Sequence, residues 1–350
     1  MPAKQPFSAK EILKNTEGNA VSLEQAKNSG SILIDVRSAE EFERGAIDGA
    51  INIPLFDGYE KSIIGTLYKH AGHQEAIDKG FEFAERKFPD LIENFRPFLD
   101  KSLAIYCAKG GMRSRSIVNL LTGLGVRASQ LEGGYHQYRR DTLDFIENFD
   151  AKLIVLHGLT GTGKTRIIER LDHAIDLEAM ARHRSSLFGG INMQPRNQRQ
   201  FEAALVTHLA SLDQPPFFIE GESNKIGRVF LPQSLAKAMK NGVMIKITAP
   251  LATRVKRIVE DYPITSKQVR IQMHNTLLTL QKWLGKDKVE TLCGHLRHNR
   301  LEELAEILLT DYYDKRYGNM YKRYVFTREI SSENLDEAAA ELAEFRRQLV

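Results

Sequence analysis

Residues 151–165 read AKLIVLHGLTGTGKT, an apolar run followed by a glycine-rich turn. The turn, Gly158–Thr165, fits the pattern G-x-x-x-x-G-K-[ST] in full and lies between an expected strand and an expected helix. In such a loop the backbone amides surround a phosphate, the lysine neutralises its charge and the last hydroxyl can bind Mg²⁺. We therefore predict a phosphate-binding α/β domain. Its loop residues are Gly158, Gly161, Thr162, Gly163, Lys164 and Thr165, with Thr165 as the candidate Mg²⁺ ligand.

The rest of the chain also alternates between strands and helices, which indicates parallel sheets with helices on both faces. After Pro250 the pattern becomes almost wholly helical. We predict two α/β domains, over residues 1–149 and 150–350, the second with a helical extension from about residue 251. The expected strands are Ser31–Arg37, Ala50–Pro54, Leu103–Cys107, Ala128–Leu131, Ala151–His157, Pro216–Glu220 and Val243–Thr248. The main expected helices are Gly80–Leu99, Arg113–Leu124, Tyr135–Phe149, Thr165–Leu171, Leu251–Asp261, Ser266–Leu284 and Lys288–Leu309.

The composition is that of an ordinary globular protein, with 42% of the 350 residues hydrophobic and 27% charged. The chain has only two cysteines, Cys107 and Cys293, which excludes a disulfide scaffold and a Cys-rich zinc site. No apolar run reaches the roughly 18 residues of a membrane helix, and residues 1–10 do not form a signal peptide. We expect a cytoplasmic protein without membrane association.

The net charge of +4 conceals a difference between the two halves. Residues 1–150 contain 19 Lys/Arg and 22 Asp/Glu, whereas residues 151–350 contain 30 and 23. A basic half of this kind suits a polyanionic partner such as a nucleic acid, although a solvated basic face would have the same composition.

The stretch LAIYCAKGGMRS, Leu103–Ser114, ends a strand at Cys107 and begins a helix at Arg113. Glycines in this loop can adopt positive φ and turn N–H groups toward the sulfur, while the helix N-terminus and the basic side chains add positive potential. Such surroundings lower a thiol pKa and bind a tetrahedral anion beside the thiolate. We predict Cys107 and Arg113 as catalytic residues and Cys293 as structural. The anion loop around Cys107 comprises Lys109, Gly110, Gly111, Met112 and Ser114.

Two alternatives remain open for this loop. A cysteine at the end of a strand is often buried and inert. The five residues between Cys107 and Arg113 also suit a phosphatase, in which the cysteine attacks phosphorus.

Further motifs in the first half resemble the rhodanese family. They are Asp35–Arg37 (DVR), Glu41–Phe42, Gly45, Asp48–Pro54 (DGAINIP) and Glu132–Tyr135 (EGGY). The resemblance covers most of residues 20–140 and implies a rhodanese-like parallel sheet with flanking helices and a chalcogen carried on the cysteine. Sulfur-transferring rhodaneses usually have one residue fewer between Cys and Arg, so the longer loop implies room for a phosphate-bearing donor.

The second half contains candidate partners for the phosphate loop. An NTPase normally supplies a carboxylate from a neighbouring strand, and the candidates are Glu220, Glu222 and Asp176. No residue identifies itself as a hydrolytic Gln or Arg, so a diphosphate substrate other than ATP is a second hypothesis.

Basic residues at Arg182–Arg184, Arg196 and Arg199 can clamp a diphosphate or contact an RNA backbone, or can form a plain surface patch. The segment Asp311–Tyr324 (DYYDKRYGNMYKRY) interleaves tyrosines with basic residues. That composition suits base stacking, and it equally suits tyrosines packing the end of a helical domain.

The two domains in this order resemble the tRNA 2-selenouridine synthase family over nearly the whole chain. The resemblance includes the five-residue spacing in the cysteine loop and an insert, Gly65–Gly80 (GTLYKHAGHQEAIDKG). In the second domain it includes Asp176–Glu178 (DLE), His183–Gly189, Glu222–Gly227 and Asp311–Tyr317. The chain departs from the family pattern at Ser185, where glycine is usual, and at Lys315, where proline is frequent.

The resemblance implies a tRNA-modifying transferase that converts 2-thiouridine at the wobble position of the anticodon to 2-selenouridine. Geranyl diphosphate first alkylates the sulfur, and selenium from selenophosphate then replaces it. Both are co-substrates, so we expect no tightly bound cofactor, with Mg²⁺ as an optional ion. The expected partners are tRNA and, as a supplier of selenophosphate, selenophosphate synthetase. The prenyl or substrate residues are Gly80, Arg184 and Glu222, and the tRNA-binding residues are Arg182, Arg196, Arg199, Lys315 and Arg316.

Three rival functions remain at this point. The first is an ATP-dependent, rhodanese-type tRNA sulfurtransferase in which the phosphate loop activates the acceptor. The second is a phosphatase fused to a nucleotide-binding module. The third is an RNA-binding protein with degenerate loops, which the presence of Cys107, Arg113, Lys164 and Thr165 disfavours.

Overall fold

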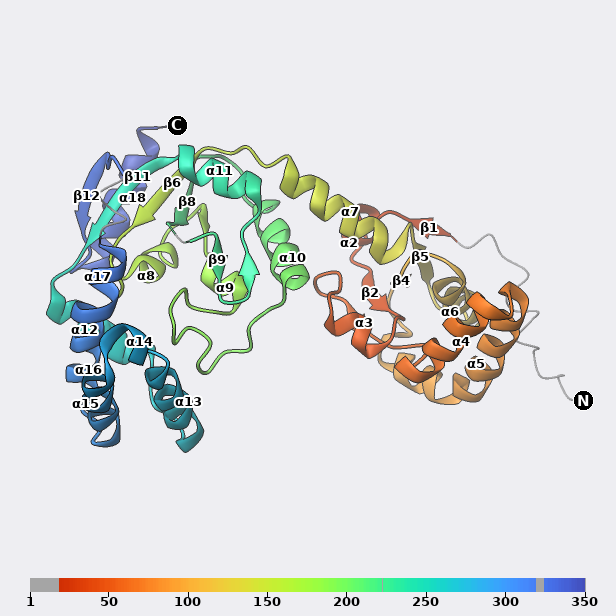
Figure 1. Cartoon of the computed structure of the whole chain (residues 1–350). Helices are drawn as coiled ribbons and strands as arrows, with labels where there is room; N and C mark the ends of the chain where they lie inside the picture. Colours follow the sequence, from red (N-terminus) through yellow and green to blue (C-terminus); the bar gives the residue numbers. More distant parts are fainter. Residues whose placement is uncertain (1–18, 222, 319–323, 350) are drawn as a thin grey trace, which may run out of the picture. The chain divides into compact units, whose positions relative to one another are not determined.

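The computed structural model describes residues 19–221, 223–318 and 324–349, apart from the side chain of Tyr317 (Figure 1). The chain divides into two compact units between Asp144 and Phe145, within helix α7 (Gly134–Glu147), whereas the sequence predicted a division at residue 149. Each unit contains its own parallel sheet. In the described part of the chain no helix has both the length and the hydropathy of a membrane span.

The first sheet has the strand order β1-β5-β4-β2-β3, and all its pairings are parallel. Because side chains alternate along a strand, Leu103 and Ile105 face one core while Ala104 and Tyr106 face another. Helices therefore cover both faces of the sheet. The strands are β1 (Ala20–Val21), β2 (Ile32–Asp35), β3 (Ile51–Asn52), β4 (Leu103–Tyr106) and β5 (Ala128–Leu131).

The insert that the sequence left without a structure is helical. It belongs to two helices that pack against each other and meet at Gly72, whose φ of +108° begins the second one. The helices of this unit are α2 (Leu23–Asn28), α3 (Ala39–Glu43), α4 (Gly58–His70), α5 (His73–Phe95), η1 (Arg96–Phe98), α6 (Met112–Gly123) and α7.

The second sheet has the order β12-β11-β6-β8-β7, again with parallel pairings. The strand that leads into the phosphate loop, β6, is central and buried throughout. The strands are β6 (Leu153–His157), β7 (Ala174–Ile175), β8 (Phe217–Glu220), β11 (Val243–Thr248) and β12 (Arg328–Ser331), with a separate antiparallel pair of β9 (Lys225–Ile226) and β10 (Val229–Phe230).

The helical extension needs one correction, because it does not continue to the end of the chain. Residues 328–347 return to the second sheet as β12, which pairs with β11, and as α18, which packs against α8. The helices that lie between β11 and β12 in the sequence pack around a separate hydrophobic core, which we call the helical core. The helices are α8 (Lys164–Ile168), α9 (Leu177–Ala181), α10 (Gln198–Leu209), α11 (Gln233–Asn241), α12 (Leu251–Asp261), α13 (Lys267–Leu278), α14 (Gln281–Leu284), α15 (Lys286–Arg297), α16 (Leu301–Ile307), η2 (Leu308–Tyr313), α17 (Asp314–Tyr317) and α18 (Leu335–Arg347).

Candidate functional site

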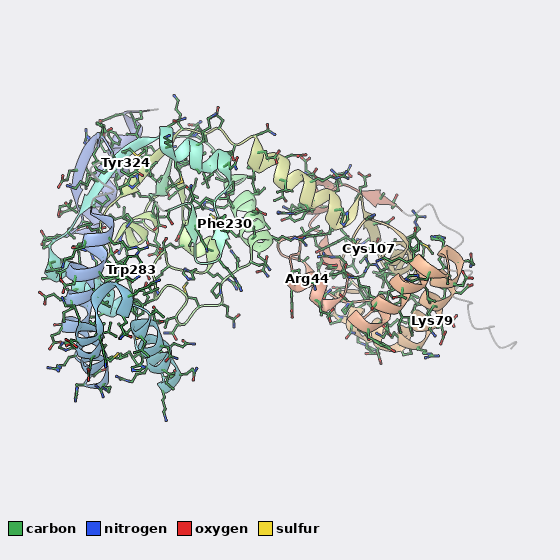
Figure 2. The ribbon with its side chains drawn as sticks, viewed as in Figure 1. Arg44, Lys79, Cys107, Phe230, Trp283 and Tyr324 are labelled. Carbon is green, nitrogen blue, oxygen red and sulfur yellow. The ribbon has the colours of Figure 1, made fainter. Side chains whose placement is uncertain are left out.

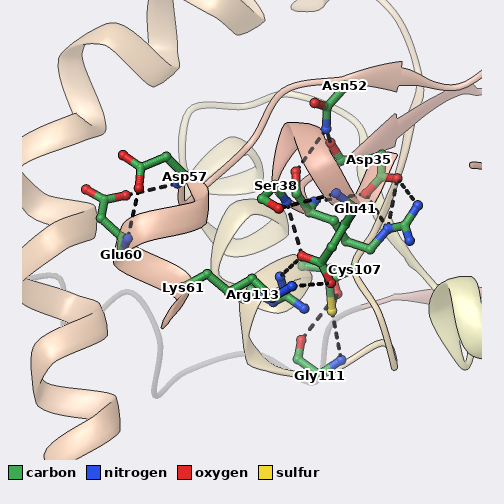
Figure 3. Close-up of polar contacts among 12 residues, drawn as sticks. Asp35, Ser38, Glu41, Asn52, Asp57, Glu60, Lys61, Cys107, Gly111 and Arg113 are labelled. Carbon is green, nitrogen blue, oxygen red and sulfur yellow. Dashed lines mark hydrogen bonds and ion pairs between the residues drawn. The ribbon is translucent and has the colours of Figure 1, made fainter. Parts of the chain in front are cut away.

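Cys107 lies at the carboxyl end of β4, directly before the loop that leads into α6. The thiol is 3% exposed. The backbone amide of Gly111 donates a hydrogen bond to its Sγ at 3.3 Å (Figure 3), and the hydroxyl of Ser114 donates another at 3.3 Å. Gly110 has the predicted positive φ, +63°, but Gly111 is extended with a φ of −97°. One positive-φ residue is therefore enough to direct an amide at the sulfur.

These contacts act on the acidity of the thiol. Burial raises the pKa of Cys107, but the hydrogen bonds from Ser114 and Gly111 and the charge of Arg113 outweigh it, so the pKa lies below its ordinary value. Burial raises the pKa of Cys293, which packs in the helical core. The pKa of Cys107 is thus lowered and the pKa of Cys293 is raised, which favours Cys107 as the reactive thiol.

The EGGY motif supports the cysteine loop from behind. The amide of Tyr135 donates to the carbonyl of Cys107 at 2.9 Å. Gly134 has a φ of +55°, and a Cβ at this position would lie 2.4 Å from that carbonyl oxygen, so only glycine allows the approach. Gln130 donates to Ser114 Oγ at 2.8 Å and orients the hydroxyl that reaches the sulfur.

Arg113 is engaged by a carboxylate that the sequence had not singled out for chemistry. Its Nη1 lies 3.1 Å from Glu41 Oε2, and Lys61 Nζ lies 3.1 Å from the other oxygen of the same carboxylate (Figure 3). Burial raises the pKa of Glu41, but Arg113 and Lys61 together hold it below its ordinary value. An anion that binds the loop must therefore share Arg113 with Glu41. Lys109 and Met112 are exposed.

The DVR motif (Asp35–Arg37) lies at the carboxyl end of β2 and connects neighbouring loops there. Arg37 forms a buried ion pair with Asp35 at 2.6 Å and donates to the carbonyl of Gly45 at 2.7 Å. Its guanidinium lies 3.9 Å from the centroid of the Tyr135 ring. The motif therefore holds the loops around β4 together, and its side chains make no described contact with the thiol.

Gly80 lies in α5, in the wall of an apolar pocket of about 200 Å³. A Cβ at this position would contact Phe56 and Ile64 at 3.7 and 3.8 Å, so larger side chains would narrow the pocket. Met112 and Arg113 also line it. The structure thus brings Gly80 together with the cysteine loop, within the first unit.

The phosphate loop joins β6 to α8. Gly163 has a φ of +84°, and a Cβ here would lie 2.9 Å from Arg257 Nη1. Lys164 Nζ donates to the carbonyl of Gly158 at 3.0 Å. Five of the six predicted loop residues line a polar hollow of about 190 Å³, whereas Thr162 is buried and its hydroxyl donates to the carbonyl of Leu159.

Two arginines of α12, which sequence reasoning missed, hold the loop from behind. Arg254 Nε donates to the carbonyl of Thr160 at 2.9 Å, and Arg257 Nη1 donates to the carbonyl of Thr162 at 2.9 Å. Ser332, which follows β12, donates to the same Thr162 carbonyl at 2.6 Å. These bonds fix the orientation of two loop carbonyls, those of Thr160 and Thr162.

Glu178 is a further residue that the sequence had placed only in a family motif. It accepts a hydrogen bond from Thr165 Oγ1 at 3.3 Å and another from the amide of Ser185. Both Glu178 and Arg184 line the hollow. The guanidinium of Arg184 lies 5.1 Å from the centroid of the Tyr262 ring. The hollow therefore offers Lys164, Arg184 and the Glu178–Thr165 pair, and it is also lined by Arg166 and Asp261, which pair with each other at 2.7 Å.

The candidate acids lie in different places. Glu220 ends β8 beside β6 and is fully buried. Asp176 accepts from the amide of Ala179 at 2.8 Å, so it caps α9 and does not line the hollow. Glu222 lies outside the described residues. The described residues include no group of three or more His, Cys, Asp or Glu arranged to hold a metal ion.

Of the four arginines that the sequence singled out, Arg182, Arg184, Arg196 and Arg199, Arg184 lines the hollow, and so does Arg166, which the sequence did not single out. Arg182 and Arg199 are exposed, and Arg196 is half-buried and donates to the carbonyl of Met180 at 3.1 Å. Arg182 and Arg199 are thus open to solvent.

The tyrosine-rich segment serves mainly as packing where it is described. Tyr312 and Tyr313 are buried in the helical core, so they are unsuited to base stacking. Arg316 lies 4.6 Å from the ring centroid of Trp283, which is 57% exposed (Figure 2), and Lys315 pairs with Asp311 at 3.0 Å. Tyr321 and the side chain of Tyr317 lie outside the described residues, and Tyr324 stacks on His157.

Comparisons with known proteins assign both units. Residues 151–348 match the model of the tRNA 2-selenouridine synthase AAA domain, and residues 19–141 match the rhodanese-like domain. The tRNA 2-selenouridine synthase of Nitrosomonas europaea is 36% identical in an alignment of 246 residues that covers 67% of this chain and 64% of that protein. The synthase of Hydrogenovibrio crunogenus is 32% identical, covering 81% of this chain and 88% of the relative, and that of Hahella chejuensis is 31% identical, covering 83% and 85%. The chain spans less than two thirds of the Nitrosomonas protein but most of the other two. On these matches, the chain belongs to the tRNA 2-selenouridine synthase family.

Proposed function

We propose that this protein converts wobble 2-thiouridine of tRNA to 2-selenouridine by two group transfers. The observation that carries the proposal is that one chain of this family holds two different loops whose groups suit an anion. One is the hydrogen-bonded thiol of Cys107, and the other is the phosphate loop with Lys164. Two phosphate-bearing co-substrates, selenophosphate and geranyl diphosphate, account for both.

In the first transfer the sulfur of 2-thiouridine attacks C1 of geranyl diphosphate. The S–C1 bond forms, the C1–O bond breaks, and pyrophosphate leaves with the electron pair. Lys164 and Arg184 line the same hollow and stabilise this charge. Oxygen atoms of Thr165 and Glu178, 3.3 Å apart, are the ligand type that Mg²⁺ prefers and would hold that ion beside the diphosphate.

In the second transfer, the selenium of selenophosphate attacks C2 of the base and forms the C2–Se bond, and water attacks the phosphorus, so that the P–Se bond breaks and phosphate leaves. The C2–S bond breaks, and the S-geranyl group leaves as a thiol after taking a proton. We place selenophosphate in the cysteine loop, near Cys107 and Arg113. The apolar pocket at Gly80, beside that loop, has the lining that a departing geranyl group requires. Alkylation makes this order chemically reasonable, because a thiol leaves more readily than a thiocarbonyl sulfur.

The tRNA backbone is assigned to the basic second half, with Arg182 and Arg199 exposed and Arg316 beside the exposed Trp283. Binding through phosphate contacts should weaken steeply with added salt.

The test supplies thiolated tRNA, geranyl diphosphate and selenophosphate, omits each in turn, and identifies the nucleosides by mass spectrometry. Cys107→Ala should accumulate S-geranyl-2-thiouridine and form no 2-selenouridine, whereas Lys164→Ala should form neither product. Cys293→Ala is the matched control and should behave as the native chain. Survival of both steps in Cys107→Ala would remove the cysteine from the mechanism, and ATP consumption stimulated by tRNA would favour a sulfurtransferase instead.

A further inference from the structure

The electron count of the second transfer limits what Cys107 can do. Selenium has the oxidation level of selenide both in selenophosphate and in 2-selenouridine, and phosphorus leaves as phosphate. A selenium atom carried on the Cys107 sulfur, as the rhodanese resemblance implies, requires an S–Se bond and therefore oxidises selenium. The electron pair of the P–Se bond would then leave on phosphorus, as phosphite, or pass to an added oxidant. Neither is part of the proposed reaction.

Attack of the sulfur on phosphorus needs no oxidant. The S–P bond forms, the P–Se bond breaks, and selenium keeps the electron pair and takes a proton from solvent, leaving as HSe⁻. This anion attacks C2 of the base, and its proton goes to the departing geranyl thiolate. Water then attacks the phosphorus on the sulfur, the S–P bond breaks, phosphate leaves and the thiolate is restored.

The cysteine loop has the groups that a phosphoryl acceptor needs. Five residues, Ala108–Met112, separate the sulfur from Arg113, one more than is usual in sulfur-transferring rhodaneses. The Arg113 side chain is 24% exposed, and only its Nη1 is bonded to Glu41, at 3.1 Å. A guanidinium has further N–H donors in a planar fork, which suits two oxygens of a phosphoryl group.

The same loop is held in one conformation by groups outside it. Gln130 Nε2 donates to the carbonyls of Gly110 and Gly111 at 2.8 and 3.0 Å, and the amide of His136 donates to the carbonyl of Ala108 at 2.8 Å. A tetrahedral phosphoryl group therefore meets a preformed loop, and its binding costs little ordering of the backbone.

Ser114 serves both halves of this reaction. Its buried hydroxyl donates to Cys107 Sγ at 3.3 Å, which favours the thiolate that attacks phosphorus. The same hydrogen bond favours the thiolate as the group that is expelled when water hydrolyses the S–P bond, because a thiol of lower pKa leaves faster.

We propose that Cys107 is the phosphoryl acceptor of the second transfer and forms a transient phosphocysteine, while selenium leaves as HSe⁻. The inference rests on the proposed function, because selenophosphate must be the donor. It places Cys107 before water in the attack on phosphorus, so that water reacts only with the phosphocysteine. Selenium is never bound to the cysteine.

The first measurement mixes the native full-length chain with selenophosphate, stops the reaction at neutral pH and analyses the Cys107 peptide by mass spectrometry. A phosphoryl group and a selenium atom add nearly the same mass, but selenium has several natural isotopes and phosphorus has one, so the isotope pattern separates them. We expect a phosphoryl group on Cys107 and phosphate in solution. Selenium on Cys107, or phosphite detected by phosphorus NMR, would overturn the proposal.

The second measurement does not require the adduct to accumulate. Phosphate that reversibly forms phosphocysteine exchanges its oxygens with water, so phosphate labelled with heavy oxygen should lose its label in the presence of the native chain. Cys107→Ala should abolish the exchange, whereas Cys293→Ala should keep the native rate. Ser114→Ala should slow it about tenfold, since the thiolate loses a hydrogen bond, and Ser116→Ala should not. A native chain that shows neither exchange nor a phosphorylated peptide contradicts the proposal.

Nucleoside analysis separates this inference from the proposed function. If the native chain forms 2-selenouridine from selenophosphate while Cys107 carries selenium, or while phosphocysteine and oxygen exchange are both absent, only the inference fails. If no 2-selenouridine forms with thiolated tRNA, geranyl diphosphate and selenophosphate all present, the proposed function fails as well.

Discussion

Ser114 offers a quantitative test of the cysteine loop. Its hydroxyl is fully buried and donates to Cys107 Sγ at 3.3 Å. A hydrogen bond to a charged group contributes about 1.5–3 kcal/mol, and about 1.4 kcal/mol corresponds to a factor of ten. At this distance to sulfur we take the lower end of that range. Ser114→Ala should therefore raise the pKa of the thiol and reduce the thiolate population about tenfold at any fixed pH below that pKa.

The same change should alter the pH dependence of stability. The folded pKa of Cys107 lies below the unfolded one, so the thiolate contributes stability that is present above the unfolded pKa. That contribution is lost as the pH falls through the folded pKa. Because Ser114→Ala brings the two pKa values closer together, it should make the free energy of unfolding less dependent on pH in this window.

The assay is a titration of the ultraviolet absorbance of the thiolate, with the signal of Cys293 removed by subtracting a Cys107→Ala titration. The alkylation rate by iodoacetamide provides an independent reading. Ser116→Ala is the matched control, because its hydroxyl donates to the carbonyl of Met112 on the same helix and does not reach the sulfur. Identical titrations of Ser114→Ala and the native chain would refute the claim that this hydrogen bond sets the acidity of the thiol.

Three further changes test other parts of the two units. Gly134→Ala places a Cβ 2.4 Å from the Cys107 carbonyl, so thiol titration should show a pKa closer to the ordinary value, and an unchanged pKa would contradict the role of this glycine. Arg37→Met leaves the buried Asp35 carboxylate without its ion pair and should cost about 3–5 kcal/mol, seen as faster hydrogen exchange in the first unit only. Arg257→Met removes the hydrogen bond to the phosphate loop and should weaken pyrophosphate binding about tenfold by calorimetry, with native affinity as the contrary result.

The strands that could be predicted from the sequence are apolar runs such as Val243–Thr248, and the short segment Ala128–Leu131 (ASQL), which lies between two expected helices. Ala128–Leu131 and Val243–Thr248 were predicted to the residue, and Leu103–Cys107 to within one. The two-residue strands β1 and β7 are too short to show a period of two, so no pattern predicts them. The start of helix α4 could have been predicted from a local motif. Asp57 and Glu60 form a capping box, in which each side chain accepts a hydrogen bond from the other residue's backbone amide.

The residues of the two candidate sites also fall into two groups, those that a local motif identifies and those that contact the loops from distant positions in the sequence. Glycines next to Cys107 and Lys164 identify both loops, because the chemistry depends on residues adjacent in sequence. The groups that tune the loops come from far along the chain. Glu41 pairs with Arg113 across 72 residues, and Arg257 reaches Thr162 across 95. A single sequence has no pattern that links such pairs, so only the fold identifies them.

The two anion sites differ in electrostatic design, and the difference bears on how each is used. In the cysteine loop the charge of Arg113 is partly balanced by Glu41, and the thiolate adds a second negative group, so the net attraction for an anion is small. The phosphate-loop hollow combines Lys164, Arg166 and Arg184 with two carboxylates, Glu178 and Asp261, of which Glu178 is already bonded to Thr165 and Ser185 and Asp261 is paired with Arg166. A diphosphate should therefore bind more tightly and for longer than a selenophosphate, which only has to stay until selenium is transferred. Under the proposed function, the diphosphate donor therefore fills its loop at a lower concentration than selenophosphate fills the cysteine loop.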